Sequence, residues 1–397
     1  MPSNSSPNPK RPTRRSLIVG TGLGLFHSAA LAHCGLRRNA RRLVCVQLTG
    51  GNDGLSTVVP VDHPVYRNQR RKTRHDQGLL ICEGGSQRSG PRRGLHPSLS
   101  KVHQEWLAGR LAIIEGVATP TPVRSHFKAL DMWHAGCMET MGRPGWLTNL
   151  AKALYGADLP AHSIVHVGDV APGSCVGHGY RPVVIDSPGS HRFTLPPIVS
   201  APHSSGDSAL AMARRQASAA KTTSVKLAAT MAAYEPSTPY PMSLLGRRLA
   251  SIGAVLKEHP EVRLLSTSYE GFDTHSNQRP THDALMEGLD GALGALLEDT
   301  RYGTDPDFLV LVFSEFGRRV SENASKGTDH GLAGPVFVLG PGIRGGLYGQ
   351  HPSLDDLDQG DLRGTTDFRC IPAEIWRRLA PAVEVPADLA RMPSLEF

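Results

Sequence analysis

Five short, mainly apolar runs are spread along the chain, and they constrain its fold more than any other feature. They occupy residues 42–48, 111–115, 262–267, 308–313 and 336–339. Runs of this length and composition are typical of buried β-strands. Between them lie segments with apolar residues at helical spacing, residues 125–137, 244–256 and 282–297. Strands alternating with helices predict an α/β fold, in which helices cover both faces of a mostly parallel sheet.

The length and composition of the chain allow one large hydrophobic core. It has 397 residues, of which 39% are hydrophobic, which is enough for a single large domain. Residues 62–95 are polar and rich in Arg and Gly, and residues 197–222 are rich in Ser, Ala and Pro. We predict a single domain over residues 33–397, with surface excursions near these two segments.

The N-terminal segment resembles an export signal more than a part of the fold. Arg14 and Arg15 precede a mildly apolar run that ends near Ala32. A twin arginine before such a run is typical of a twin-arginine signal peptide, and Ala30-Leu31-Ala32 offers a cleavage site. We predict a signal peptide over residues 1–32, the twin-arginine export machinery as a partner, and a periplasmic or cell-envelope protein without a stable membrane span when mature. An uncleaved membrane anchor is the alternative.

Charge and cysteines exclude some classes of protein. The formal net charge is +7, but no basic stripe interleaved with aromatic residues occurs, so we expect no nucleic-acid partner. The six cysteines are scattered and include no C-x-x-C pair, so no zinc ribbon is indicated. The sequence leaves their pairing open.

Acidic residues follow three of the predicted strands. Asp53 comes after the first, Asp273 after the third and Glu315 after the fourth. Ligands bind beyond the carboxyl ends of strands in open α/β sheets, so these acids are expected at one edge. His275 lies two residues after Asp273, where both side chains point the same way in an extended chain.

A further acid and histidine, Asp329 and His330, lie in a glycine-flanked loop after the fourth strand. Carboxylates mixed with imidazoles suit Zn, Mn or Fe. We therefore predict that Asp53, Asp273, His275, Glu315, Asp329 and His330 hold one or two divalent ions, with Zn the first choice. Taken singly, the motifs also fit ordinary structure: a turn at Asp53, and a salt bridge from Glu315 to Arg318 or Arg319.

Motifs along nearly the whole chain resemble a known family. They include "VQLTGGNDGLSTVVP", "RSHFKALDMW", "GFDTHSNQ", "VLVFSEFGRR", "GTDHG" and "VFVLGPGIRGGLYG". On these motifs the chain is identified as a member of the exported bacterial family catalogued as domain of unknown function 1501, which is similar to the alkaline phosphatase and sulfatase superfamily. The resemblance implies a three-layer α/β/α sandwich with a mostly parallel mixed sheet, alkaline-phosphatase-like, and a two-metal site.

The resemblance also implies roles for individual residues. Ser125 matches the metal-activated nucleophile by position, although its simpler role is to cap a helix. Arg124 offers a fork for phosphoryl or sulfuryl oxygens, or else a surface ion pair. His126 and His134 are nearby imidazoles that we interpret as structural.

Two departures from the superfamily pattern place one metal position in doubt. The middle pair is Asp-x-His, and Glu315-Phe316 stands where an Asp-His pair is usual. Asp329 or His126 could supply the missing ligand, or the site could hold a single ion. The cysteine signature of formylglycine sulfatases is absent.

The sequence therefore predicts a metal-dependent hydrolase of phosphate or sulfate esters, acting on a small or polymeric anionic substrate. The alternative is a degenerate, non-catalytic member that binds metal and an anionic polymer or a partner protein. A Ser-His-acid hydrolase is disfavoured, because no Gly-x-Ser-x-Gly elbow surrounds Ser125.

Overall fold

The structure is a computed structural model that describes residues 42–82, 90–177, 179–186, 209–301 and 308–397. The predicted signal peptide, residues 1–32, lies outside the described residues. The chain from residue 40 to residue 397 forms one compact unit. Within the described ranges, no helix combines the length and the apolar character that crossing a membrane requires.

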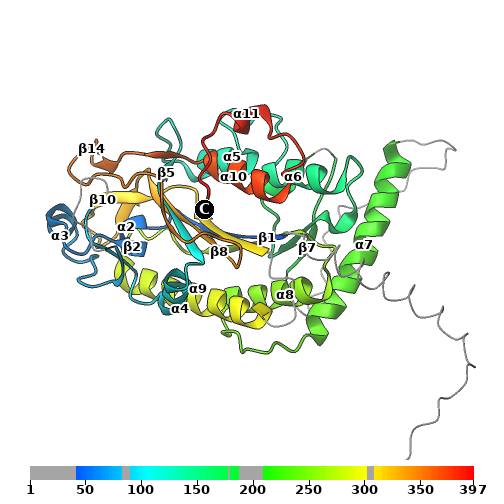
Figure 1. Ribbon diagram of the computed structural model, residues 1–397, viewed down its shortest axis with the longest axis horizontal. Coiled ribbons are helices and arrows are strands. Elements are labelled where there is room, and N and C mark those ends of the chain that lie inside the picture. The colour runs from blue at the N-terminus through cyan, green and yellow to red at the C-terminus, as the bar shows by residue number, and fades with distance from the viewer. Residues whose placement is uncertain (1–41, 83–89, 178, 187–208, 302–307) are drawn as a thin grey trace, which may run out of the picture. The chain divides into compact units, whose positions relative to one another are not determined.

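A nine-stranded mixed sheet lies at the centre of this unit (Figure 1). Its strands follow the order β13, β5, β12, β9, β1, β8, β6 and β7, and β16 pairs with β5. In that order their bounds are Gly346–Tyr348, Leu111–Ala118, Gly334–Leu339, Phe308–Ser314, Arg42–Thr49, Leu264–Glu270, Ile164–Val167, Val183–Ile185 and Thr366–Asp367. β12 is antiparallel to both of its neighbours, and the other pairs are parallel.

Successive side chains along the strands pack alternately into two apolar clusters, one on each face of the sheet. In β1, Val44 and Val46 pack in one apolar cluster with α4 (Ser100–Leu107), α7 (Ala209–Ala233), α8 (Leu244–Glu258) and α9 (Gln278–Arg301). Leu43 and Cys45 pack in the other cluster with α5 (His126–Ala135), α6 (Trp146–Tyr155) and α10 (Cys370–Leu379). Successive side chains of a strand point to opposite faces, so helices cover both faces (Figure 1). The predicted three-layer α/β/α fold is confirmed.

The five predicted strands correspond to β1, β5, β8, β9 and β12. The prediction missed β6, β7, β13 and β16, which have two to four residues each. The predicted helices correspond to α5, α8 and α9. Part of segment 197–222, where we predicted a surface excursion, instead belongs to the long helix α7. Alanine, serine and threonine fill much of α7, so its sequence carries little amphipathic signal.

Short elements surround the main sheet. They are the helices α2 (Gly54–Thr57), α3 (Pro64–Gln69) and α11 (Ala387–Ala390), and the 3₁₀ turns η1 (Ala161–Ser163) and η2 (Gly173–Cys175). Small sheets join β2 (Val58–Val59), β3 (Leu79–Cys82) and β4 (Arg93–Leu95), then β10 (Arg318–Glu322) and β11 (Thr328–His330), then β14 (Leu357–Asp358) and β15 (Asp361–Leu362).

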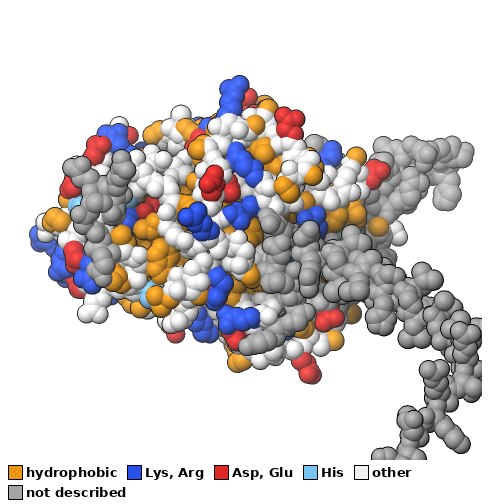
Figure 2. Space-filling view, viewed as in Figure 1, with side chains coloured by type: hydrophobic (Ala, Val, Ile, Leu, Met, Phe, Trp, Pro, Cys, Tyr) orange, Lys and Arg blue, Asp and Glu red, His pale blue; other side chains and the backbone are white. Residues whose placement is uncertain are grey.

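The segment 62–95, predicted as a surface excursion, contains α3, β3 and β4. It also places two arginines, Arg70 and Arg93, in the interior of the protein. On the face shown in Figure 2, basic and acidic side chains are intermixed rather than gathered by sign.

Candidate metal centre

The candidate site lies where three neighbouring parallel strands end. β9, β1 and β8 are adjacent in the sheet and run in the same direction, so their carboxyl ends share one edge. Glu315 follows the last residue of β9 directly, and Asp273 lies three residues beyond β8. The β10–β11 hairpin then returns His330 to this edge, in register with Arg318.

Three imidazoles and one carboxylate converge at this edge. The Nε2 atom of His330 lies 3.0 Å from Nε2 of His126 and 2.9 Å from Nε2 of His275. Asp273 Oδ1 lies 3.0 Å from Nε2 of His275, 3.2 Å from that of His330 and 3.6 Å from that of His126. We call His126, Asp273, His275 and His330 the histidine cluster.

Each imidazole of the cluster has an acceptor at its other ring nitrogen. The acceptors are Glu315 Oε1 at 2.7 Å from His126 Nδ1, Asp329 Oδ1 at 3.1 Å from His275 Nδ1, and the Arg124 carbonyl oxygen at 2.8 Å from His330 Nδ1. Carboxylates and carbonyls only accept, so each Nδ1 atom carries the proton. In the neutral imidazoles every Nε2 atom then presents a lone pair to the centre of the cluster.

Lone pairs that face one another at about 3 Å need positive charge between them. A divalent ion held by these nitrogens would supply that charge. The ligand atoms that all lie within 4.8 Å of one another belong to His126, Asp273 and His330. Two neutral nitrogens and one carboxylate oxygen are donors that suit Zn, and acceptors behind the ligating histidines are usual at metal sites.

The charges around the cluster also call for a cation. Asp273, Glu315 and Asp329 contribute three carboxylates, and Arg318 contributes one guanidinium, with its Nη2 atom 2.5 Å from Asp273 Oδ1. Two negative charges are left, which one divalent ion would neutralise.

The cluster is open to solvent on one side. The exposed fraction of the side chain is 50% for Asp273 and 44% for His275, against 26% for His126 and 23% for His330. An ion held here could therefore accept a water molecule or a substrate atom, as catalytic metal sites require.

Hydrogen bonds shift the ionisation of the surrounding groups. The hydrogen bond to Glu315 raises the pKa of His126, which makes this imidazole a stronger base and a better ligand. Burial acts to raise the pKa of Asp273, but the hydrogen bond and the positive charge of Arg318 help to lower it to about 2. Asp273 is therefore ionised at neutral pH.

Hydrogen bonds from Arg318 connect the ends of the strands near the cluster. Its side chain is 0% exposed and donates to the carbonyl oxygens of Gly50, Gly51, Phe272 and Thr328 as well as to Asp273. Because it spans the ends of β1, β8 and β10–β11, it sets the position of Asp273 relative to His330. The salt bridge from Glu315 to Arg318 that the sequence also allowed is not present.

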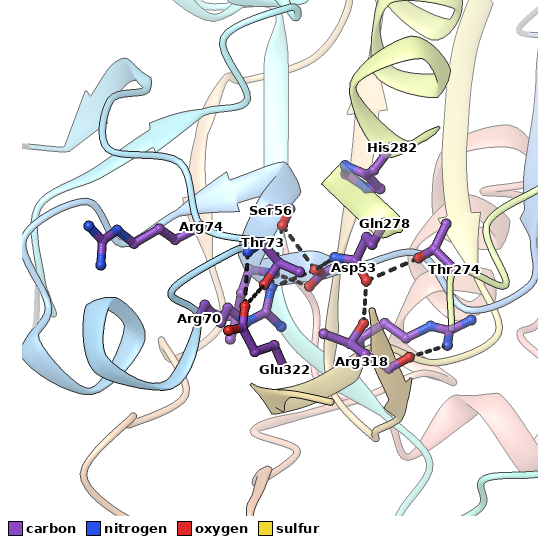
Figure 3. Close-up of polar contacts among 12 residues, drawn as sticks. Asp53, Ser56, Arg70, Thr73, Arg74, Thr274, Gln278, His282, Arg318 and Glu322 are labelled. Atoms are coloured by element: carbon purple, nitrogen blue, oxygen red, sulfur yellow. Dashed lines mark hydrogen bonds and ion pairs between the residues drawn. The ribbon is translucent and has the colours of Figure 1, made fainter. Parts of the chain in front are cut away.

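Asp53 does not lie in the histidine cluster. Its carboxylate is 0% exposed and is ion-paired with Arg70 Nη1 at 2.5 Å. It also accepts hydrogen bonds from Gln278, from Ser56 at 2.9 Å and from the Leu55 amide at 3.2 Å (Figure 3). Burial acts to raise the pKa of Asp53, but Arg70 lowers it well below its usual value. Both oxygens already have donors, so the geometry is that of a buried ion pair rather than of a metal ligand.

The other predicted ligands divide between two positions. Asp273, His275 and His330 lie in the cluster, whereas Glu315 and Asp329 stand behind His126 and His275 and accept from their Nδ1 atoms. The structure thus brings five of the six predicted metal residues to one place, three in direct convergence and two behind them.

The two predicted catalytic residues, Arg124 and Ser125, directly precede α5. Ser125 is its N-cap residue, is exposed, and makes no side-chain capping hydrogen bond. Its hydroxyl has no hydrogen-bond partner in the part of the chain that the structure describes. The Arg124 guanidinium is ion-paired with Asp361, while the Arg124 carbonyl oxygen lies behind His330.

From the sequence we interpreted His126 as structural, with a replacement metal ligand as the alternative, and the structure places it in the cluster. Its position directly after the Ser125 cap was the available signal, because the first residue of α5 faces whatever the helix N-terminus approaches. His134, also interpreted as structural, donates from Nε2 to Gln47 Oε1 at 2.9 Å, and burial lowers its pKa to about 4.

A second group of possible ligands, His75, His96 and Asp283, fits a metal less well. His96 Nδ1 accepts from the Ser98 amide at 3.1 Å, so the proton of the neutral ring is on Nε2, which lies 3.0 Å from Asp283 Oδ1. A ligating Nε2 would need a lone pair there, and the Ser98 contact denies it. The histidine cluster therefore presents free Nε2 lone pairs to an ion, whereas Nε2 of His96 carries a proton and cannot bind one.

Comparisons with known proteins give one family match and several solved structures of low sequence identity. The family model described as "Protein of unknown function (DUF1501)" matches residues 119–361. No curated protein matches the chain. Three solved structures illustrate the similarity in fold. A protein in the alkaline phosphatase superfamily from Vibrio parahaemolyticus is 9% identical, with TM-score 0.41, and the match covers 89% of this chain and 69% of that chain.

The lipoteichoic acid synthase LtaP from Listeria monocytogenes is 7% identical, with TM-score 0.41 and coverage of 90% and 76%. A putative sulfatase from Bacteroides thetaiotaomicron is 11% identical, with TM-score 0.41 and coverage of 90% and 74%. These similarities are too distant to assign an activity.

Proposed function

Since this chain belongs to the DUF1501 family, whose description assigns no function, we propose from its own site that it is a metal-dependent hydrolase of phosphate or sulfate esters. The observation that carries the proposal is the convergence of the His126 and His330 Nε2 atoms with Asp273 Oδ1, beside which His275 Nε2 lies 2.9 Å from His330 Nε2. Each of these imidazoles has an acceptor at Nδ1. Such a set would hold a divalent ion, with Zn preferred by its nitrogen content and Mn or Fe as alternatives.

One ion is the number that the ligands support. The cluster offers a single point of convergence, and Asp53, which a second ion would require, is taken by Arg70. A bound divalent ion would act as a Lewis acid and lower the pKa of a hydroxyl that coordinates it.

Ser125 is the candidate nucleophile. Its hydroxyl is exposed, free of hydrogen bonds in the described part of the chain, and one residue from the ligand His126. Attack by its oxygen on phosphorus or sulfur would break the bond to the departing alcohol, and water would then release the acid from the serine. The free N–H groups in the first turn of α5 would stabilise the anionic oxygens.

The second candidate function is binding without catalysis, and the Asp53–Arg70 ion pair favours it. If ester hydrolysis in this fold needs two ions, a chain whose Asp53 is not available for the second ion would bind one metal and an anionic polymer or a partner protein, without turnover. Both candidates require the histidine cluster to bind metal, and they differ in whether Ser125 turns over a substrate.

The experiment that tests the hydrolase is turnover of aryl phosphate and aryl sulfate esters by the metal-loaded wild type and by Ser125→Ala. The hydrolase predicts activity in the wild type and its loss in Ser125→Ala, with metal content unchanged. Ser100→Ala, at the first residue of α4, is the matched control and should keep activity. Full activity in Ser125→Ala would remove Ser125 as nucleophile, and no activity with metal bound would favour the second candidate.

We also propose that the protein is exported by the twin-arginine route. The support is the Arg14-Arg15 pair before an apolar run. Replacement of both arginines by lysine should keep the chain in the cytoplasm in a fractionation experiment, and unchanged export would contradict this.

A further inference from the structure

We propose that Arg124 and Arg319, held by the buried carboxylate of Asp361, form an anion-binding subsite beside the histidine cluster. The substrate would then be an ester that carries a second anionic group, a carboxylate, phosphate or sulfate, apart from the group that is cleaved. This assignment of substrate class rests on the proposed function, whereas the anion subsite itself does not.

The subsite is built on one carboxylate that binds two guanidinium groups. Arg124 donates from Nε, at 2.8 Å, and from Nη2 to Asp361 Oδ2, and Arg319 donates from Nε to Oδ1 at 3.0 Å. Arg319 Nη2 also donates to the Gln359 carbonyl oxygen at 2.5 Å. The Asp361 side chain is 0% exposed, while those of Arg124 and Arg319 are 37% and 38% exposed. Asp361 thus fixes both guanidinium groups and leaves them accessible.

The pair keeps one positive charge and free donors. Two guanidinium groups share one carboxylate, so one charge is not compensated within the subsite. The Nη1 atoms of Arg124 and Arg319 make no hydrogen bond within the residues that the structure describes. Planar guanidinium groups with free N–H donors suit carboxylate, phosphate and sulfate oxygens.

The subsite is close to the cluster but lies behind it. The Arg124 carbonyl oxygen accepts from His330 Nδ1, on the side of the ring away from the converging Nε2 atoms. Arg319 is the neighbour of Arg318, which pairs with His330 across the β10–β11 hairpin. A group at the metal would therefore contact the Nε2 side, and a different group of the same molecule would reach the arginines.

A cavity of about 380 Å³ adjoins the segments that carry Arg124 and Asp361. Its lining includes Thr119 and Pro122 before Arg124, Leu332, and on either side of Asp361 the charged residues Asp358, Arg363 and Asp367. The cavity lies at the carboxyl end of β5, which runs parallel to β9 and so ends at the same edge of the sheet as the cluster. Ligands of α/β sheets bind at this edge.

The test measures anion binding without turnover. Chelator-treated protein, from which metal has been removed, is titrated with inorganic sulfate in a calorimeter at low ionic strength, for the wild type, Arg319→Gln and Arg319→Lys. We expect saturable binding to the wild type and at least about a tenfold weaker affinity in Arg319→Gln, because a charge-assisted contact is lost. Arg319→Lys should fall between them, since it keeps the charge but not the fork.

The matched control is Arg67→Gln. Arg67 and Arg74 also share one carboxylate, Asp76, but that carboxylate is 63% exposed and does not fix its partners in the same way. Wild-type affinity for sulfate should persist in Arg67→Gln. Absence of saturable sulfate binding to the folded wild type, or equal affinity in wild type and Arg319→Gln, would overturn the subsite. Because the protein is metal-free, a failure of the hydrolase proposal would not change either result.

Discussion

The Glu315 carboxylate lies 2.7 Å from Nδ1 of His126, and its side chain is 0% exposed. The contact joins the end of β9 to the start of α5 across 189 residues of sequence. Glu315 also accepts from the Gly50 amide at 2.9 Å, so the same carboxylate holds the turn after β1. Its role in the structure is to fix the ring of His126 and the tautomer that exposes Nε2.

Glu315→Gln tests this positioning role. Glutamine keeps the size of the side chain but removes the negative charge that makes His126 more basic, so we expect the affinity for Zn to fall by about 10- to 100-fold. Competition with a chelator of known affinity measures the change. Glu287→Gln, at an exposed position of α9, should leave the affinity unchanged, and equal affinities in all three proteins would contradict the role assigned to Glu315.

Asp53→Asn separates a structural ion pair from a metal ligand. The substitution leaves Arg70 buried without its charged partner, which costs about 3–5 kcal/mol of stability. We expect urea unfolding to show this loss while the folded variant keeps the metal content of the wild type. A folded Asp53→Asn protein that has lost its metal would instead make Asp53 a ligand.

Gly50→Ala tests the turn that carries the site. Gly50 has φ +118°, and an added Cβ atom would lie 2.5 Å from the backbone nitrogen of Asp273. The substitution must displace the segment that bears Asp273 and His275. We expect a loss of about 1–3 kcal/mol in stability from backbone strain, and weaker Zn binding.

Gly109→Ala is the control for this effect. Gly109 also has a positive φ, +69°, but nothing lies within 4 Å of an added Cβ atom. It should lose some stability through strain and keep the wild-type affinity for Zn. If Gly50→Ala also kept that affinity, the turn would not position the cluster.

Buried neutral histidines predict a loss of stability in mild acid. Burial lowers the pKa of His166 to about 4 from its usual value of 6.5. The unfolded state therefore takes up the proton first as the pH falls, so the contribution of His166 to stability is present above pH 6.5 and is lost towards pH 4. The shift corresponds to about 3 kcal/mol.

His166→Asn removes this titration and can still bond the hydroxyl of Ser266, 2.8 Å from His166 Nδ1. Urea unfolding of both proteins between pH 7 and pH 4 measures it. The variant should be less stable at pH 7 but lose less stability on acidification. Parallel pH profiles would show that His166 does not titrate in this range.

Local sequence was sufficient for the main strands and for part of the site. The apolar runs of β1, β8 and β9 marked both the strands and their ends. Asp273 after β8 and Glu315 after β9 could be placed near one another because parallel strands end at one edge. Asp273 and His275 share a direction because they are two residues apart in extended chain. His330 was predicted at this edge because its segment follows β9, but the structure places it in β11 rather than in the expected loop.

Contacts between distant segments were not accessible in this way. The ion pair of Asp53 depends on Arg70, which lies in a polar segment that carried no strand or helix pattern. The place of His126 depends on where α5 docks against the end of β9, and the contact of Asp361 with Arg124 joins β15 to a residue 237 positions earlier. Local periodicity in the sequence does not predict contacts of this kind. Only the three-dimensional structure shows which acid lies among the converging Nε2 atoms and which acids contact the Nδ1 atoms of the histidines.

The central claim is that the histidine cluster binds one divalent ion. Metal content by plasma mass spectrometry, measured on the wild type, His330→Ala, Asp273→Asn and the control His162→Ala, tests it most directly, since His162 lies outside both groups of possible ligands. The account predicts about one equivalent of Zn, Mn or Fe in the wild type and in His162→Ala, and its loss in the other two variants. A folded wild type that binds no metal after reconstitution, or variants that retain it, would contradict the account.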